Sequence, residues 1–83
     1  MELKDTIEMM TSDDFKERFK AEYWQTKIRY EKLHKMVIKM EAGTLNFEPK
    51  CPMILFHRQL GAMRELLNTL EIRAEIEGID LEV

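Results

Sequence analysis

The sequence predicts an all-α fold, an antiparallel two-helix hairpin with a short N-terminal helix that assembles as a homo-oligomer. Three observations predict it. The 83 residues include only 3 Gly and 2 Pro, so turns are few and long helices are favoured over many short strands. Two long segments place apolar residues at alternating steps of four and three, which is the spacing of one helix face. The apolar residues outside these two faces exceed what one hairpin can cover.

A chain of this length forms one domain at most, and we expect that domain to span residues 1–83. A connection of roughly ten residues between two long helices is typical of an antiparallel hairpin. The expected elements are a short N-terminal helix over 1–10, a helix over 12–42, a loop over 43–52, a helix over 53–77 and a tail over 78–83.

The first long helix has clear signals at both ends. Thr11 and Asp14 have the spacing of a capping box, and Met10 and Phe15 fall at the two positions of a hydrophobic staple around it. Gly43 is typical of a C-cap glycine. The apolar face predicted between these ends consists of Phe15, Phe19, Tyr23, Thr26, Tyr30, Leu33, Val37 and Met40.

The second long helix is bounded by proline and glycine. Pro49 and Pro52 prevent helix through the loop, and Pro52 is well placed to open the helix that follows. Gly78 ends that helix, and Phe47 is expected to anchor the loop on the helices. The apolar face predicted for this helix consists of Phe56, Leu60, Met63, Leu67, Leu70 and Ala74.

Several large apolar residues lie off both faces. If they were exposed they would form a patch of a kind that monomers rarely carry. A second copy is the simplest cover, so we expect a homo-oligomer with closed symmetry. A distinct partner protein is the alternative. The residues concerned are Trp24, Ile28 and Ile38 on the first helix and Leu55, Leu66 and Ile76 on the second.

The net charge of −3 is unevenly distributed. Residues 1–14 hold one Lys and five acidic residues, residues 15–39 hold eight Lys or Arg and three Glu, and residues 65–83 hold one Arg and six acidic residues. A basic middle between acidic ends disfavours binding to a nucleic-acid polymer but permits a local anion site. Most of these charges also fit ordinary solvated helix faces.

We expect no signal for export or membrane insertion in this chain. Cys51 is the only cysteine, so no internal disulfide can form and a reducing intracellular setting is expected. The N-terminus, MELKDTIEMM, resembles neither a signal peptide nor a transit peptide. The longest apolar run, residues 53–56, is too short to cross a bilayer, so no membrane partner is expected.

No signature of catalysis or cofactor binding is present in the sequence. It contains no P-loop, Rossmann glycine pattern, nucleophile elbow or paired metal-ligand spacing. His34, His57 and Cys51 are the candidate metal ligands, but their spacing matches no zinc motif, and both histidines are expected on helix surfaces. We therefore expect a protein that is not an enzyme and holds no metal or cofactor.

One face of the first helix combines aromatic rings with basic side chains. Trp24 shares it with Lys27 and Lys35, and Tyr23 borders it. A ring that stacks on a base, beside ammonium groups that meet an anion, suits a ligand with a base and a phosphate. Alternatively, Trp24 packs in an interface while the lysines stay in water.

A polar line follows the second helix, where Gln59, Leu66 and Arg73 lie seven residues apart. Arg73 can pair with Glu77 one turn later, which is worth little at a surface, or offer a planar fork to a phosphate at a subunit boundary. Gln59 and Arg64 can contact base edges or phosphate oxygens. The candidate ligand-binding residues are therefore Tyr23, Trp24, Lys27, Lys35, Gln59, Arg64 and Arg73.

The stretch RQLGAMRELLNTLEIRAEIEGI resembles the second helix of a family of small phage helical-hairpin proteins. In that family a Gln, an Ala-Met pair, a Leu and an Arg recur in this order, which here would be Gln59, Ala62-Met63, Leu70 and Arg73. The first helix, FKERFKAEYWQTKIRYEKLHKM, followed by EAGTLNF and CP, resembles the small-protein branch of crAss-like phages. The resemblance covers about residues 12–80.

This family is related to phage sponges that counter the CBASS and Thoeris defence systems. Those proteins sequester cyclic oligonucleotides or cyclic ADP-ribose isomers without cleaving them, and they assemble as oligomers, commonly hexamers, with pockets between subunits. The resemblance implies a non-enzymatic binder of cyclic nucleotides in the host cytoplasm, with Arg73 at the recurrent arginine position. The alternative is an oligomeric helical interaction module that inhibits a host protein or has a structural role in the phage.

Overall fold

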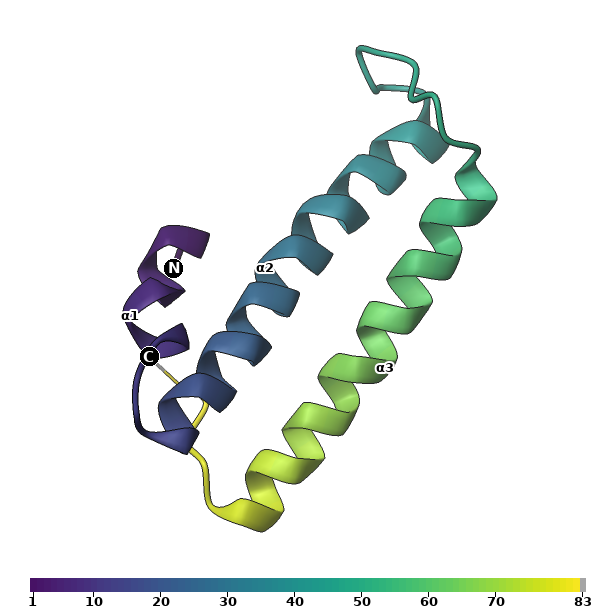
Figure 1. Cartoon of the computed structure of the whole chain (residues 1–83). Helices are drawn as coiled ribbons and strands as arrows, with labels where there is room; N and C mark the ends of the chain where they lie inside the picture. The colour runs from purple at the N-terminus through teal and green to yellow at the C-terminus, as the bar shows by residue number, and fades with distance from the viewer. Residues whose placement is uncertain (83) are drawn as a thin grey trace.

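The computed structural model describes residues 1–82, and these residues form α-helices and one short 3-10 helix, with no strand among them. The two long helices lie side by side and run in opposite directions (Figure 1). The molecule measures 43 × 24 × 18 Å. The predicted all-α class is confirmed. In chain order the elements are η1 (Leu3–Thr6), α1 (Ile7–Met10), α2 (Phe15–Ala42) and α3 (Met53–Glu77).

The helix α2 begins at Phe15, because Asp14 and not Thr11 is its N-cap. The Asp14 backbone is extended, and its carboxylate accepts a hydrogen bond at 2.9 Å from the backbone N–H two residues later. Thr11 instead belongs to the end of α1, where its hydroxyl donates to the Ile7 carbonyl at 3.0 Å. The predicted capping box and hydrophobic staple are therefore wrong, since both require an N-cap at Thr11.

Both long helices end at glycines in the left-handed region, as predicted. Gly43 closes α2 with φ 76°, and Gly78 closes α3 with φ 69°. A side chain at either position would strain the backbone, so glycine allows the chain to leave each helix sharply. Pro52 is the N-cap of α3, where no intrahelical hydrogen bond needs its missing N–H.

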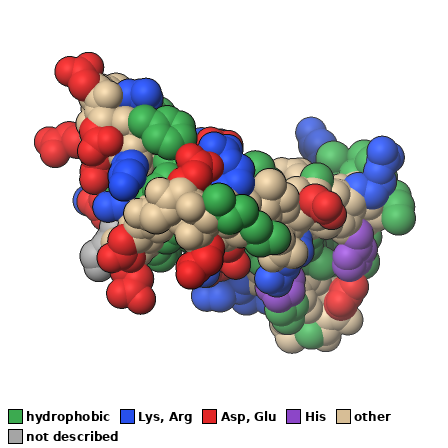
Figure 2. Space-filling view, turned by 90° about the horizontal axis from the view of Figure 1, so that it is seen from below, with side chains coloured by type: hydrophobic (Ala, Val, Ile, Leu, Met, Phe, Trp, Pro, Cys, Tyr) green, Lys and Arg blue, Asp and Glu red, His purple; other side chains and the backbone are tan. Residues whose placement is uncertain are grey.

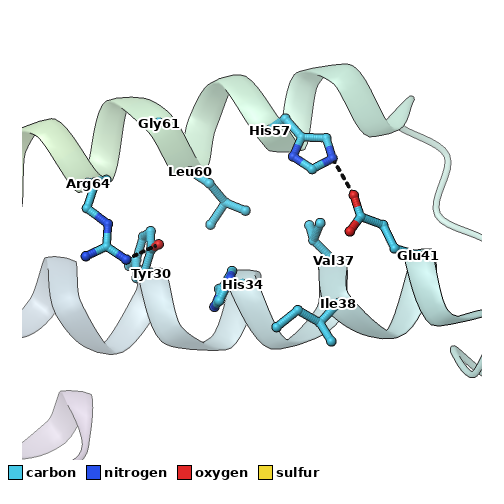
Figure 3. Close-up of a pocket in the computed structure, with 9 residues that line it drawn as sticks. All are labelled: Tyr30, His34, Val37, Ile38, Glu41, His57, Leu60, Gly61 and Arg64. Carbon is cyan, nitrogen blue, oxygen red and sulfur yellow. Dashed lines mark hydrogen bonds and ion pairs between the residues drawn. The ribbon is translucent and has the colours of Figure 1, made fainter.

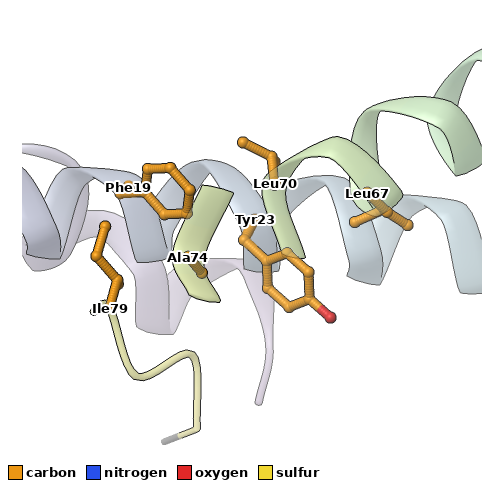
Figure 4. Packing of buried hydrophobic residues seen from close by; sticks show 6 residues of the cluster. All are labelled: Phe19, Tyr23, Leu67, Leu70, Ala74 and Ile79. Carbon is orange, nitrogen blue, oxygen red and sulfur yellow. The ribbon is translucent and has the colours of Figure 1, made fainter. Parts of the chain in front are cut away.

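The hydrophobic core lies between the first half of α2 and the second half of α3, at the end of the hairpin away from the loop. Leu70 is only 1% exposed there, and full burial of a leucine contributes about 1.5–3 kcal/mol. The core draws on both predicted faces and gains one residue from the tail. Its members are Phe19, Tyr23, Leu67, Leu70, Ala74 and Ile79 (Figure 4).

The N-terminal segment packs against α2 through Thr6, which is 1% exposed. Its hydroxyl donates to the Leu3 carbonyl at 2.7 Å and accepts from the Gln25 side-chain amide at 2.9 Å. A buried hydroxyl that both donates and accepts leaves no unpaired polar atom. Gln25 therefore holds the N-terminal segment to α2, and Figure 1 shows this segment beside α2.

The tail after α3 turns back across α2. Ile79 is buried, Leu81 packs against the core, and the Trp24 indole N–H donates to the Leu81 carbonyl at 2.7 Å. The tail therefore covers part of the Trp24 side chain, which is half-buried.

A second heptad-spaced line runs along α3, one position before each residue of the predicted apolar face, and continues to Ile76. Every member is exposed, including Ile76 at 78% and Leu55 at 44%. Figure 2 shows hydrophobic side chains open to solvent between charged ones. We call this line the outer line of α3, and it consists of Leu55, Gln59, Ala62, Leu66, Thr69, Arg73 and Ile76.

The loop between the long helices is not anchored by Phe47, contrary to the prediction from the sequence. Phe47 is 57% exposed, so its predicted anchoring role is wrong, and the half-buried residues of the loop are Leu45 and Pro49. Within residues 1–82, no helix has the length and apolar character needed to span a membrane.

Candidate functional site

Tyr23, Trp24 and Lys27 lie together on α2, and we call them the aromatic cluster. The Trp24 ring meets the Tyr23 ring edge-on, with centroids 5.4 Å apart. The Lys27 ammonium lies 5.6 Å from the Tyr23 centroid and 5.8 Å from the Trp24 centroid, which is within cation–π range. A single chain therefore assembles three of the seven predicted residues.

The Tyr23 hydroxyl connects the aromatic cluster to α3. It accepts a hydrogen bond from Lys27 Nζ at 3.3 Å and donates to Glu71 Oε2 at 2.9 Å. Burial and the hydrogen bond to Glu71 raise the pKa of Tyr23 above its ordinary value of 10.0, and Lys27 opposes this shift. The phenol is therefore neutral at physiological pH and serves as a donor.

Trp24 has a packing role within one chain. Its indole N–H is bonded to the Leu81 carbonyl, and the tail covers part of its surface. Trp24 therefore packs against the tail of its own chain, whereas the alternative given above places it in an interface. A ligand that stacks on Trp24 must use the part of the ring that the tail leaves open.

Lys35 and Gln59 lie away from the aromatic cluster. Lys35 lines a hollow of about 280 Å³ formed by α2 and the N-terminal residue Met1. Gln59 lines a hollow of about 340 Å³ between α2 and α3, together with Arg29. One chain therefore does not bring these two side chains into a common pocket with Trp24.

Arg73 lies on the outer line of α3 and makes two contacts. Its Nε donates to Glu77 Oε2 at 3.0 Å, the pair expected from the four-residue spacing. Its guanidinium carbon lies 4.9 Å from the centroid of the Phe19 ring, over the edge of the core. The ion pair engages only Nε, which leaves the outer N–H groups of the guanidinium able to meet an anion.

Arg64 lies in a groove of about 310 Å³ between the loop-side halves of α2 and α3, which we call the α2–α3 groove (Figure 3). Its Nη2 donates to the Tyr30 hydroxyl at 2.7 Å, and its guanidinium carbon lies 4.8 Å from the Tyr30 centroid. The Tyr30 ring stacks on His34 with centroids 5.6 Å apart and planes 16° apart. Val37 and Leu60 are buried and form the floor.

Sequence reasoning missed most of this groove. His34 and His57 are exposed, as expected, but both line it. His57 Nε2 lies 3.0 Å from Glu41 Oε1 at the end nearer the loop. The four-residue spacing of Tyr30 and His34, and the position of Gly61 inside a long helix, were the signals available in the sequence.

The described part of the chain contains no group of three or more His, Cys, Asp or Glu side chains that could hold a metal ion. Cys51 is exposed in the loop and has no disulfide partner.

The family model for Sequestin matches residues 13–76, which include all of α2 and nearly all of α3. The chain belongs to the Sequestin family. The name Sequestin indicates a sequestering role, which is a role in binding rather than in catalysis. All seven candidate binding residues lie within the part that matches Sequestin. No curated protein and no solved structure matches the chain.

Proposed function

We propose that the chain is a phage anti-defence sponge. It binds and sequesters cyclic nucleotide immune messengers, either cyclic oligonucleotides or cyclic ADP-ribose isomers, in the host cytoplasm without cleaving them. Membership of the Sequestin family carries the proposal, because it indicates sequestration. The resemblance of residues 12–80 to the phage hairpin family supports the messenger class.

Capture works by mass action. The phage supplies enough sites to lower the free messenger below the concentration that the host effector needs. A nanomolar dissociation constant corresponds to about −12 kcal/mol. Several phosphate contacts together with stacking on an aromatic ring in a partly dry pocket can supply binding of this strength.

We further propose that the chain is a homo-oligomer, and the hexamer is the state common in the phage family that it resembles. The outer line of α3 supports this, because its four-and-three spacing is that of a helix-pairing seam and its large apolar members are exposed. The same line carries Gln59 and Arg73. In an oligomer these two side chains lie at a boundary between chains, where the free N–H groups of Arg73 can meet a phosphate.

A thermal-shift screen with cyclic dinucleotides, cyclic trinucleotides and cyclic ADP-ribose isomers tests the proposal. We expect a stabilised protein that returns the ligand intact after denaturation. Arg73→Ala and Trp24→Ala are expected to weaken binding without preventing assembly, whereas Lys50→Ala removes an exposed loop charge and serves as the control. Normal binding by both Arg73→Ala and Trp24→Ala would show that the site lies elsewhere.

A second candidate function is a helical interaction module that inhibits a host protein or has a structural role in the phage. The observation that favours it is the exposure of Ile54, Ile72 and Ile76 on α3, at 63%, 62% and 78%. One host protein recovered on pull-down, together with no thermal shift from any cyclic nucleotide, would favour this candidate over the sponge.

A further inference from the structure

One end of the α2–α3 groove has the chemistry of an anion site. Nη2 of Arg64 is bonded to the Tyr30 hydroxyl, and in residues 1–82 no carboxylate lies within 4.0 Å of this guanidinium. The Tyr30 oxygen accepts that bond, so its own O–H stays able to donate. A guanidinium without a carboxylate, beside a further donor, is well suited to a phosphate.

The other end of the groove disfavours an anion. Glu41 lies there, paired with His57 at 3.0 Å (Figure 3). Between the two ends lie His34 and the buried apolar floor of Val37 and Leu60. This distribution of charge places a phosphate at the Arg64 end and leaves the middle of the groove for an apolar or aromatic part of a ligand.

Gly61 is not explained by the packing of a single chain. It lies inside α3, where glycine is destabilising relative to alanine. A Cβ atom at this position would meet no atom within 4 Å, so no described neighbour requires glycine. Gly61 lines the α2–α3 groove, and its missing side chain leaves room beside Arg64 and Leu60.

We propose that the α2–α3 groove binds one nucleotide unit, with its phosphate on Arg64 and Tyr30 and its base beside His34 over the apolar floor. The groove holds about 310 Å³, at the lower end of the range for ligand pockets, about 300–1,000 Å³. That volume suits a single nucleotide better than a whole cyclic oligonucleotide. About 10 Å of helix separates Tyr30 from Val37, which gives the base a place next to the phosphate.

This site is complete within one chain. It therefore rests neither on the proposed oligomer nor on the proposed messenger, and it is separate from the aromatic cluster and from Arg73. Isothermal titration calorimetry of the full chain with adenosine 5′-monophosphate tests this site. Adenosine alone probes the place of the base, and inorganic phosphate alone probes the place of the phosphate. We expect adenosine 5′-monophosphate to bind more tightly than either adenosine or inorganic phosphate.

Two variants that each lose one arginine charge from α3 test the contact with the phosphate. Arg64→Ala is expected to weaken binding of adenosine 5′-monophosphate about tenfold or more, as for loss of a charged hydrogen bond. Arg58→Ala removes an equal charge from the same helix and is expected to retain the affinity of the parent chain. Equal losses in the two variants would overturn the proposal, since general charge attraction would then explain the binding.

Gly61→Leu examines the groove without altering Arg64. A Cβ atom at this position meets no described atom within 4 Å, and leucine favours the helix over glycine. We therefore expect an unfolding midpoint at least as high as that of the parent chain, together with loss of nucleotide binding. Normal nucleotide affinity in this variant would overturn the proposal. If Gly61→Leu binds the nucleotide normally but has a different light-scattering mass from the parent chain, Gly61 lies at a contact between copies of the chain instead.

The outcomes separate this site from the proposed sponge function. A protein that binds a cyclic messenger but not adenosine 5′-monophosphate overturns the groove proposal alone. A protein that binds the monophosphate, with NMR shift changes centred on His34, Gly61 and Arg64, but binds no cyclic messenger supports the groove and overturns the sponge.

Discussion

The Tyr23 hydroxyl joins the two long helices through a hydrogen bond of 2.9 Å to Glu71 Oε2, a residue 48 positions later in the sequence. Lys27 donates to the same hydroxyl at 3.3 Å. A neutral phenol therefore lies between a cation and a carboxylate at the edge of the core. The contact depends on the proton of Tyr23, which makes it sensitive to alkaline pH.

The raised pKa of Tyr23 predicts a loss of stability at high pH. The unfolded chain releases this proton near pH 10.0, whereas the folded chain holds it to a higher pH because of burial and Glu71. The contribution to the free energy of unfolding is thus fully present below pH 10.0 and is lost as pH rises through the raised pKa. Urea unfolding measured on both sides of this value checks the prediction.

Tyr23→Phe is the matched variant for this pH effect. It removes the hydroxyl, costs about 0.5–1.5 kcal/mol at neutral pH, and is expected to lose less stability than the parent chain at alkaline pH. An unchanged alkaline loss in Tyr23→Phe would assign the effect to other groups.

Trp24→Phe is expected to release the tail while leaving the helices intact. The substitution keeps an aromatic ring but removes the indole N–H that donates to the Leu81 carbonyl. We expect a loss of about 1 kcal/mol in the free energy of unfolding. Hydrogen exchange measures the effect locally: amides after Gly78 should exchange faster, and amides in the middle of α2 should change little. Equal changes in both regions would contradict the assignment.

Leu70→Ala and Leu66→Ala compare the core face of α3 with its outer line. Leu70 is 1% exposed and Leu66 is 39% exposed. Leu70→Ala is expected to cost about 2–5 kcal/mol, because it leaves a cavity in the core. Leu66→Ala should change the stability of a single chain far less, and in an oligomer it should reduce the light-scattering mass. A large loss of stability in Leu66→Ala without a change in mass would contradict this division of the helix.

Alanine is expected to have opposite effects at Gly61 and Gly43. Gly61→Ala should stabilise the chain by about 0.5–1 kcal/mol, because the residue is helical and the added methyl group meets no neighbour. Gly43→Ala should destabilise it by about 1–2 kcal/mol, because its φ of 76° is left-handed. Thermal unfolding of the two variants measures both signs, and a destabilised Gly61→Ala would reveal a close neighbour absent from a single chain.

The helical class and the core faces could be predicted from the sequence because they depend on local spacing. Leu60, Leu67, Leu70 and Ala74 fall on the predicted face of α3 and are buried. Gly43 also ends its helix as predicted, since only the conformational freedom of glycine fits that turn. The N-cap of α2 was assigned to the wrong residue, because Thr11, Ser12 and Asp14 all have capping side chains and tertiary context decides among them.

The candidate site was predicted less well, because its geometry depends on how the two helices are placed together. The neighbours Tyr23, Trp24 and Lys27 share one turn of α2, and local spacing was enough to group them. The contact between Arg64 and Tyr30 joins residues 34 positions apart, and no helical period specifies it. The tail over Trp24 was missed for the same reason.

The hydrogen bond between Trp24 and the Leu81 carbonyl makes the fluorescence of Trp24 a reporter of the position of the tail. Trp24 is the only tryptophan of the chain, so all indole emission comes from the place where the tail meets α2. The emission wavelength of Trp24 and its quenching by acrylamide therefore report release of the tail from α2 without any label. Stopped-flow fluorescence of the unmodified chain can therefore compare the rate at which the tail is released with the rate at which a ligand binds.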